Sequence, residues 1–304
     1  MGVSNKNKGE QKTLGKAPFN KLFTRNVPHI LEKIFFSLDY ASFKECMEVH
    51  RAWHELLTSK SFKQFGKLTF QREIETALWH ATRSGNAKEV RAVLSTGMVN
   101  IECMTDEDNT PLLIAVDKGH NDLVQLLLEA GANPNSPSTD FEFDWTPLYW
   151  AALRGDHDVA KLLIEAGGNV NMEARDGKIP LHLAKGRKVV KLLLDEGSHL
   201  HKECASRNTP LHYASMVGRI DEVKYLLERG ADPNRPGIRG KTPFHSIFTY
   251  NPILIRNAKL TTKLLIDNGA DVNMVDNNGH TPLWFALRKG HTEAANLIRE
   301  HGGV

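Results

Sequence analysis

A short motif, Thr-Pro-Leu-x-x-Ala or a close variant of it, recurs along the last three quarters of the chain. The clear copies begin at Thr110, Thr146, Thr209, Thr242 and Thr281, and weaker copies begin at Thr76 and Ile179. Their spacing is near 33 residues. A period of this length predicts a stack of small units, each of which buries its apolar face only against its neighbours. No catalytic motif repeats in this way, so the pattern favours a binding protein.

Each copy predicts two short helices and a connecting turn, as residues 110–135 illustrate. Pro111 suits the first turn of a helix, where its missing N–H has no intrahelical partner to lose. Gly119 can adopt the left-handed conformation that ends such a helix. Apolar residues at helical spacing then indicate one buried face of a second helix, namely Leu123, Val124, Leu127 and Leu128. Gly131 ends this helix, and the polar stretch that follows predicts a turn or β-finger.

The array resembles ankyrin repeats, since several positions of the pattern agree in six or seven copies. The resemblance implies an all-α solenoid over residues 71–304, with about seven repeats and β-hairpin or turn fingers between them. The repeats start near 76, 110, 146, 179, 209, 242 and 281. Repeat four is three residues short after Ala184. We therefore expect a clipped first helix or inter-helix loop there, and a weak joint in the stack.

Two fingers are the predicted target-binding sites. The finger 136–145 is three residues longer than its equivalents and carries three aromatic residues, Phe141, Phe143 and Trp145. Exposed aromatic side chains commonly anchor protein partners. The finger 235–241 is basic, with Arg235, Arg239 and Lys241. Two alternatives to target binding stay open. The finger sequences can reflect neutral drift in a solvated loop, or the aromatic rings can fold back and stabilise their own finger.

The histidines and finger asparagines have structural or modification roles in this interpretation. His182, His212 and His245 follow Pro-Leu or Pro-Phe, where we expect hydrogen-bonding rather than metal ligation, because no cysteine lies at ligand spacing. Finger asparagines of ankyrin repeats can be hydroxylated. The residues that match this position, each with Leu eight residues before, are Asn135, Asn171, Asn234 and Asn273.

The segment 21–67 does not follow the repeat period and predicts three short helices. A module this small is usually unstable without a partner that covers its apolar surface. The segment resembles an F-box, with Val27-Pro28 in place of the usual Leu-Pro and one residue fewer before Ile30. The resemblance assigns adaptor binding to Val27, Pro28, Ile30, Leu31, Ile34, Phe35, Val49 and Trp53. The alternative is a helical cap that seals the first repeat.

Composition narrows the function further. The net charge is +3, but residues 1–25 carry six basic residues and one acidic residue, so the rest of the chain is at −2. We predict a disordered basic tail over 1–20 and no nucleic-acid binding by the array. Three distant cysteines imply no disulfide framework, and no apolar run reaches membrane-spanning length. The sequence contains neither a catalytic constellation nor a phosphate-binding loop.

The F-box and ankyrin resemblances together imply a substrate receptor of a cullin-RING ubiquitin ligase. Such a chain is not an enzyme and needs no cofactor. Its implied partners are a Skp-family adaptor with its cullin core and an unknown target protein, with one copy of the chain per complex. The expected location is the cytoplasm, with the nucleus as an alternative. The competing interpretation is a non-ligase ankyrin scaffold that mediates protein–protein interactions in signalling or transcription.

Overall fold

The computed structural model describes residues 66–97, 99–104, 109–138, 144–249 and 257–304. The chain divides into a unit over Met1–Arg72 and a larger unit over Glu73–Val304. Within the described residues all regular secondary structure is helical and no strand occurs. The predicted all-α class is thus confirmed for this part of the chain. The F-box-like residues 27–53 and the predicted tail lie outside the described residues.

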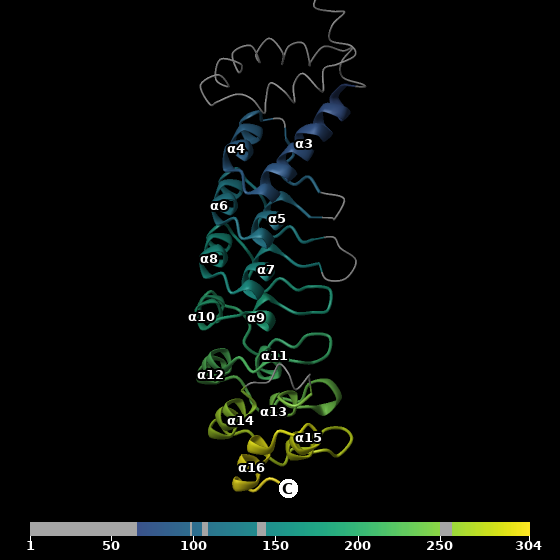
Figure 1. Cartoon of the computed structure of the whole chain (residues 1–304), viewed down its shortest axis with the longest axis vertical. Coiled ribbons are helices and arrows are strands. Elements are labelled where there is room, and N and C mark those ends of the chain that lie inside the picture. The colour runs from purple at the N-terminus through teal and green to yellow at the C-terminus, as the bar shows by residue number, and fades with distance from the viewer. Residues whose placement is uncertain (1–65, 98, 105–108, 139–143, 250–256) are drawn as a thin grey trace, which may run out of the picture. The chain divides into compact units, whose positions relative to one another are not determined.

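The helices of the larger unit form two parallel columns (Figure 1). The inner column contains α3 (Gly66–Ser84), α5 (Pro111–Lys118), α7 (Pro147–Arg154), α9 (Pro180–Leu183), α11 (Pro210–Val217), α13 (Pro243–Ser246) and α15 (Pro282–Arg288). The outer column contains α4 (Ala87–Ser95), α6 (Asn121–Glu129), α8 (His157–Glu165), α10 (Arg187–Asp195), α12 (Ile220–Glu228), α14 (Ala258–Asp267) and α16 (Thr292–Glu300). The fingers project from the inner column, on the side away from the outer helices.

Local sequence sets where the inner helices begin and end. Thr110 is the N-cap of α5, and its hydroxyl accepts a hydrogen bond from the Leu113 N–H at 3.3 Å. Pro111 is the first helical residue, as predicted. Gly119 ends the helix with φ at 73°, a conformation that favours glycine. The same threonine, proline and glycine arrangement bounds α7 and α11.

A continuous apolar core runs between the two columns. Repeats two and three each contribute one fully buried leucine from the inner helix and another from the outer helix, namely Leu112 with Leu127 and Leu148 with Leu163. Inner helices pack against the next inner helix and against their own outer helix. The core therefore depends on stacking, because no single repeat encloses it.

The first copy and the fingers differ from the expectation. Thr76 lies within α3, a 19-residue helix that begins ten residues earlier at Gly66. Its motif lacks the proline that defines the other starts, so nothing ends the helix before this position. The fingers in the described residues are tight turns without strands. In one of them the Ala174 N–H donates to the Lys178 carbonyl at 2.8 Å.

Repeat four is shortened in its inner helix, as the residue count predicts. The helix α9 has four residues, and Gly186 already caps α10 with φ at 85°. Two side chains of repeat five satisfy the backbone groups left by the missing turn. The Arg219 guanidinium donates to the carbonyls of Leu183 and Ala184, both at 2.8 Å. The buried Glu222 carboxylate accepts the Gly186 N–H at 2.6 Å.

These contacts change the expectation of a weak joint. Buried backbone groups without partners would destabilise the shortened repeat. Arg219 and Glu222 supply those partners, and the Lys185 N–H also donates to the Ala152 carbonyl at 2.9 Å. Repeat four is therefore braced from both sides, and we expect its stability to depend on the two side chains of α12.

Candidate functional site

Ion pairs join neighbouring fingers on the side of the inner column. They connect Arg175 to Asp144, Lys202 to Glu173 and Arg235 to Glu203, at N–O distances of 3.1, 2.6 and 2.7 Å. Exposed pairs of this kind contribute little to stability, in the range of about 0–1 kcal/mol. Their main effect is to neutralise much of the finger charge and to restrict the fingers relative to one another.

The basic finger 235–241 is less uniform than its sequence suggests. Arg235 is neutralised by Glu203, whereas Arg239 is exposed and forms no ion pair with a described carboxylate. Lys241 lies over the Phe285 ring, with Nζ 4.7 Å from the ring centre. Partial burial lowers the pKa of Lys241. The predicted target-binding cations are thus in three different environments.

The aromatic finger is described only in part. Phe141 and Phe143 lie outside the described residues. Trp145 is half-buried and stacks on Tyr149, with ring centres 5.0 Å apart. It also meets Trp150 edge-on at 5.0 Å. Trp145 therefore packs on α7 in this structure, and a role in target binding would use its remaining exposed edge.

The three histidines of the inner helices connect successive repeats. In His212, Nδ1 accepts the Thr209 N–H at 3.0 Å, and Nε2 donates to the Lys241 carbonyl of the next finger at 3.1 Å. His182 and His245 have the same arrangement with their own neighbours. Burial lowers the pKa of His182 and of His212 to about 4. These histidines are neutral structural residues, as expected from the sequence.

The four finger asparagines form clamps between repeats. Each side-chain amide donates to the carbonyl of a glycine in the next repeat, at 2.9–3.0 Å. Each amide oxygen also accepts a backbone N–H two residues beyond that glycine, at 2.7–3.0 Å. The asparagines and their glycines are Asn135 with Gly167, Asn171 with Gly197, Asn234 with Gly269, and Asn273 with Gly302. Hydroxylation of these residues stays a prediction.

Two junctions depart from the asparagine clamp. At the first, the Glu102 carboxylate accepts the Asn133 N–H at 2.7 Å and the Ser136 hydroxyl at 2.6 Å. At the junction between repeats four and five, His201 occupies the asparagine position, and the described residues contain no equivalent clamp there. Arg219 and Glu222 act at this same junction.

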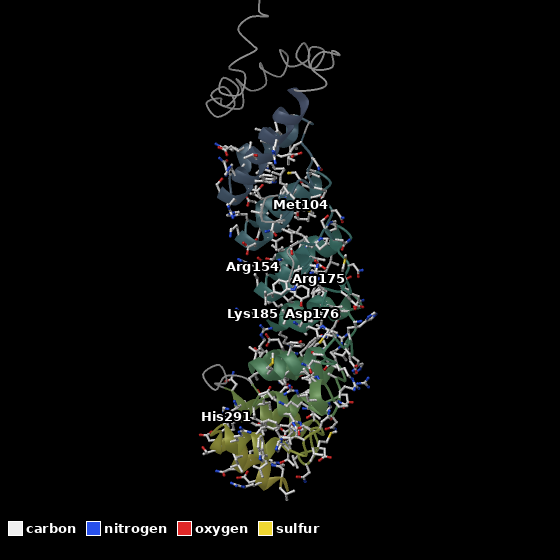
Figure 2. All side chains as sticks on the ribbon, turned by 90° about the vertical axis from the view of Figure 1, so that its right-hand side faces the viewer. Met104, Arg154, Arg175, Asp176, Lys185 and His291 are labelled. Carbon is white, nitrogen blue, oxygen red and sulfur yellow. The ribbon has the colours of Figure 1, made fainter. Side chains whose placement is uncertain are left out.

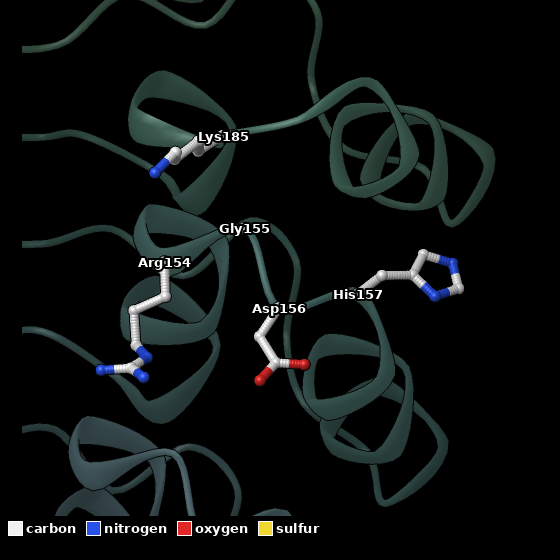
Figure 3. A pocket seen from close by; sticks show the side chains of 5 residues that line it. All are labelled: Arg154, Gly155, Asp156, His157 and Lys185. Carbon is white, nitrogen blue, oxygen red and sulfur yellow. The ribbon is translucent and has the colours of Figure 1, made fainter.

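An open depression of about 530 Å³ lies beside the shortened repeat, lined by Arg154, Gly155, Asp156, His157 and Lys185 (Figure 3). The Arg154 guanidinium donates to the Asp117 carbonyl at 2.5 Å. The Asp156 carboxylate caps α8 by accepting the Val159 N–H at 3.2 Å. The depression is polar and shallow, and its side chains form no nucleophile–base or acid–base pair.

A row of partly exposed apolar residues follows the inner column. These residues are Trp150, Leu183, Tyr213 and Phe285. Each is the fourth residue after the N-cap of its helix, so the equivalent helices present them in the same direction. Lys178 lies over the Tyr213 ring at 5.1 Å, as Lys241 does over Phe285. We call the surface of the inner helices, from the fingers to the C-terminal ends of these helices, the inner face.

Cations border the inner face on the side opposite the fingers. Arg154 and Lys185 lie toward one side of the stack in this view, and Arg175 and Asp176 lie beside them toward the other side (Figure 2). Arg288 and Lys289 take the corresponding place at the end of α15. The repeat pattern of the sequence does not predict these cations as binding residues. The available signal was their shared position, one or two residues before the glycine of the motif in the regular repeats.

The described cysteines and metal-binding residue types indicate no reactive centre. Burial raises the pKa of Cys103 to about 12, and Trp79 donates a hydrogen bond to its sulfur at 3.1 Å. A thiol of this pKa is unreactive at neutral pH. In the described part of the chain, no three histidine, cysteine, aspartate or glutamate side chains group as metal ligands do. None of the described helices has the length and apolar character required to span a membrane.

Comparison with known families agrees with this geometry. Models of ankyrin repeats match residues 54–138, 136–204, 206–238 and 254–298. This is an ankyrin-repeat protein.

An ankyrin repeat protein of Rickettsia felis is 33% identical over 76 residues, which are 25% of this chain and 33% of that protein. The chain therefore aligns with about a third of the length of that relative. The ankyrin repeat domain of Bcl-3, a member of the IkappaB protein family, superposes with a TM-score of 0.59 at 22% identity. The match covers 73% of this chain and 97% of that domain. At this identity the likeness shows the ankyrin fold alone.

Ankyrin arrays are generally non-catalytic modules for protein–protein interaction, and the geometry above agrees with that role. The family matches begin at residue 54 and leave residues 1–53 without an ankyrin assignment. The candidate adaptor-binding residues, from Val27 to Trp53, fall in this part of the chain and outside the described residues.

Proposed function

We propose that the chain is the substrate receptor of a cullin-RING ubiquitin ligase. The observation that carries the proposal is the F-box-like pattern in residues 21–67, placed directly before an ankyrin array. The F-box-like segment would bind a Skp-family adaptor through Pro28, Leu31, Ile34 and neighbouring apolar residues. The array would bind the target protein. Such a receptor would act in the cytoplasm or the nucleus.

In this role the chain contributes proximity rather than bond chemistry. A receptor that holds its target near the ubiquitin-conjugating enzyme raises the effective concentration of target lysines. The array suits this task because its core and inter-repeat clamps position the inner face over several repeats. The fingers 136–145 and 235–241 remain the proposed contact sites at its rim.

A non-ligase ankyrin scaffold is the second candidate. One observation favours it: the ankyrin match starts at residue 54, inside the F-box-like segment. The end of that segment can therefore also be interpreted as the first unit of the array. In a scaffold, residues 27–53 would cap the stack rather than bind an adaptor.

Adaptor capture distinguishes the two candidates. The full chain is expressed with an affinity tag in cells, and co-purification of the Skp-family adaptor and cullin is measured. For a receptor, Pro28→Ala with Leu31→Ala removes adaptor and cullin, while Lys263→Ala, an exposed change on α14, retains both. Absence of the adaptor from the wild-type complex would refute the receptor role and leave the scaffold.

A further inference from the structure

Within repeats three to seven, charge is distributed unequally between the inner and outer sides of the array. The inner helices and fingers contain eleven basic and five acidic residues, a net charge of +6. This count covers the segments 144–155, 172–186, 201–218, 235–249 and 274–290. The outer-helix segments contain ten basic and thirteen acidic residues, a net charge of −3. They are residues 156–171, 187–200, 219–234, 257–273 and 291–304. Counting Asp140 and Glu142 of the finger 136–145 leaves the inner side of repeats three to seven at +4. The corresponding segment of repeat two, residues 101–119, has five acidic residues and one basic residue, so the positive charge is confined to repeats three to seven.

The cations at the edge of the inner face are also unpaired. Arg154, Lys185, Arg288 and Lys289 are exposed, and none forms an ion pair with a described carboxylate. By contrast, the finger cations Arg175, Lys202 and Arg235 are each paired with an acidic residue of another finger. The net charge of the inner face is therefore concentrated along its edge and at Arg239 and Lys241.

Stabilisation of helix ends does not account for this pattern. Cations near a helix C-terminus interact favourably with the helix dipole, and this would apply equally to both columns. The inner helices α5, α7 and α15 carry Lys118, Arg154 and Arg288 in their last turns. Among the outer helices, α6, α8, α10, α12 and α14 have no basic residue in their last turns, whereas α16 carries Arg299 there and Arg229 caps α12. Basic residues are thus more frequent at the ends of the inner helices than at the ends of the outer helices.

Between the cations lies the apolar row of Trp150, Leu183, Tyr213 and Phe285. Finger cations contact two of these rings, since Lys178 lies over Tyr213 and Lys241 lies over Phe285. The inner face thus combines an apolar centre with cations on both sides. Charge complementarity at such a surface sets orientation and association rate, and buried aromatic contacts supply most of the affinity.

We infer that the inner face binds an extended acidic segment of a protein, with apolar side chains at regular intervals. This inference rests on the protein-binding role of the array and applies to a receptor and to a scaffold alike. Packed helices are about 8–10 Å apart, and an extended chain advances about 3.3 Å per residue. A bound segment therefore passes one repeat about every three residues, and roughly fifteen residues cover the five repeats from three to seven.

Three synthetic peptides test the inference against the full chain by fluorescence anisotropy. The first has Leu or Trp at every third position and Glu between them. The second replaces the apolar residues by Ser, and the third replaces each Glu by Lys. We expect the acidic apolar peptide to bind at least tenfold more tightly than either of the others, and binding to weaken as salt rises.

Charge reversal locates the binding surface. Lys185→Glu with Lys289→Glu should weaken the acidic apolar peptide at least tenfold without changing the melting temperature, because both side chains are exposed and unpaired. The matched control, Lys263→Glu with Arg299→Glu, makes the same charge change on exposed positions of α14 and α16 and should alter the dissociation constant less than twofold.

Three results would overturn the inference: equal binding of the acidic and basic peptides, equal effects of the two reversals, or a 15-nucleotide single-stranded DNA that binds as tightly as the acidic apolar peptide. The last outcome would assign the inner face to nucleic acid. None of these measurements depends on the adaptor. Failure here is therefore separate from failure of the receptor proposal, which is decided by Pro28 and Leu31.

Discussion

Acid should destabilise the array through His182 and His212, and the structure gives the size of the effect. In each residue Nδ1 accepts a backbone N–H, and Nε2 donates to a carbonyl of the next finger. A proton added at Nδ1 would face another N–H group inside the core. The neutral imidazole is therefore the form that fits these hydrogen bonds, in agreement with the pKa that burial lowers.

The magnitude follows from linkage. The pKa of both histidines is about 4 in the folded state, compared with 6.5 for an unperturbed imidazole. Between these values the unfolded chain binds more protons, so the free energy of unfolding falls as the pH falls. At about 1.36 kcal/mol per unit, each histidine removes up to ~3 kcal/mol, and the loss is complete below pH 4.

The assay is urea unfolding followed by circular dichroism at several values between pH 7 and pH 4, fitted with a nearest-neighbour model for repeats. The double variant His182→Leu with His212→Leu is the comparison, since Leu113 occupies the same position in repeat two. It should be less stable at pH 7 by about 2–4 kcal/mol, because buried hydrogen bonds are lost. Its stability should depend much less on pH. Equal pH dependence of the variant and the wild type would refute the reasoning, as would imidazole pKa values near 6.5 measured by NMR.

Three further predictions concern the junctions and the aromatic finger. Asn171→Ala removes two hydrogen bonds to repeat four and should lower the free energy of unfolding by about 1–3 kcal/mol. His201→Asn should create a clamp between repeats four and five and raise the free energy of unfolding by about 0.5–1.5 kcal/mol. A stabilised Asn171→Ala variant would contradict the role of the clamp. Arg219→Ala should speed amide hydrogen exchange over residues 184–190 by tenfold or more relative to 112–118, and unchanged exchange would show that the brace is dispensable. Phe141→Ser with Phe143→Ser should abolish target capture at an unchanged melting temperature, while a lowered melting temperature with capture intact would show that the rings pack on their own finger.

The repeat boundaries could be predicted from sequence because their determinants are local. A threonine cap, a proline in the first turn and a glycine at the end specify a helix within about ten residues. The shortened repeat four followed from counting residues after Ala184. The weak first copy could not be placed, because Thr76 lies inside a helix whose start is set by residues outside the motif.

The contacts between repeats could not be predicted, because their partners are backbone atoms. Asn135 was recognised as a special position, but its clamp ends on the Gly167 carbonyl, 32 residues further along the chain. Every residue has a carbonyl, so the partner leaves no trace in the sequence. Arg219 and Glu222 were missed for the same reason. The cations of the inner face were missed because single basic residues before a glycine are also common helix-end residues.

The asparagine clamp also has a consequence for how such a chain can change in length. Each clamp uses the same side chain and the same two backbone groups, so a duplicated repeat brings with it both halves of a junction that already works. Insertion or deletion of one whole unit beside Asn135 or Asn234 would therefore recreate a complete junction. The boundary at His201 lacks this interchangeability, because repeats four and five are fitted to each other by Arg219 and Glu222. We therefore expect a change in repeat number at this boundary to involve both repeats together.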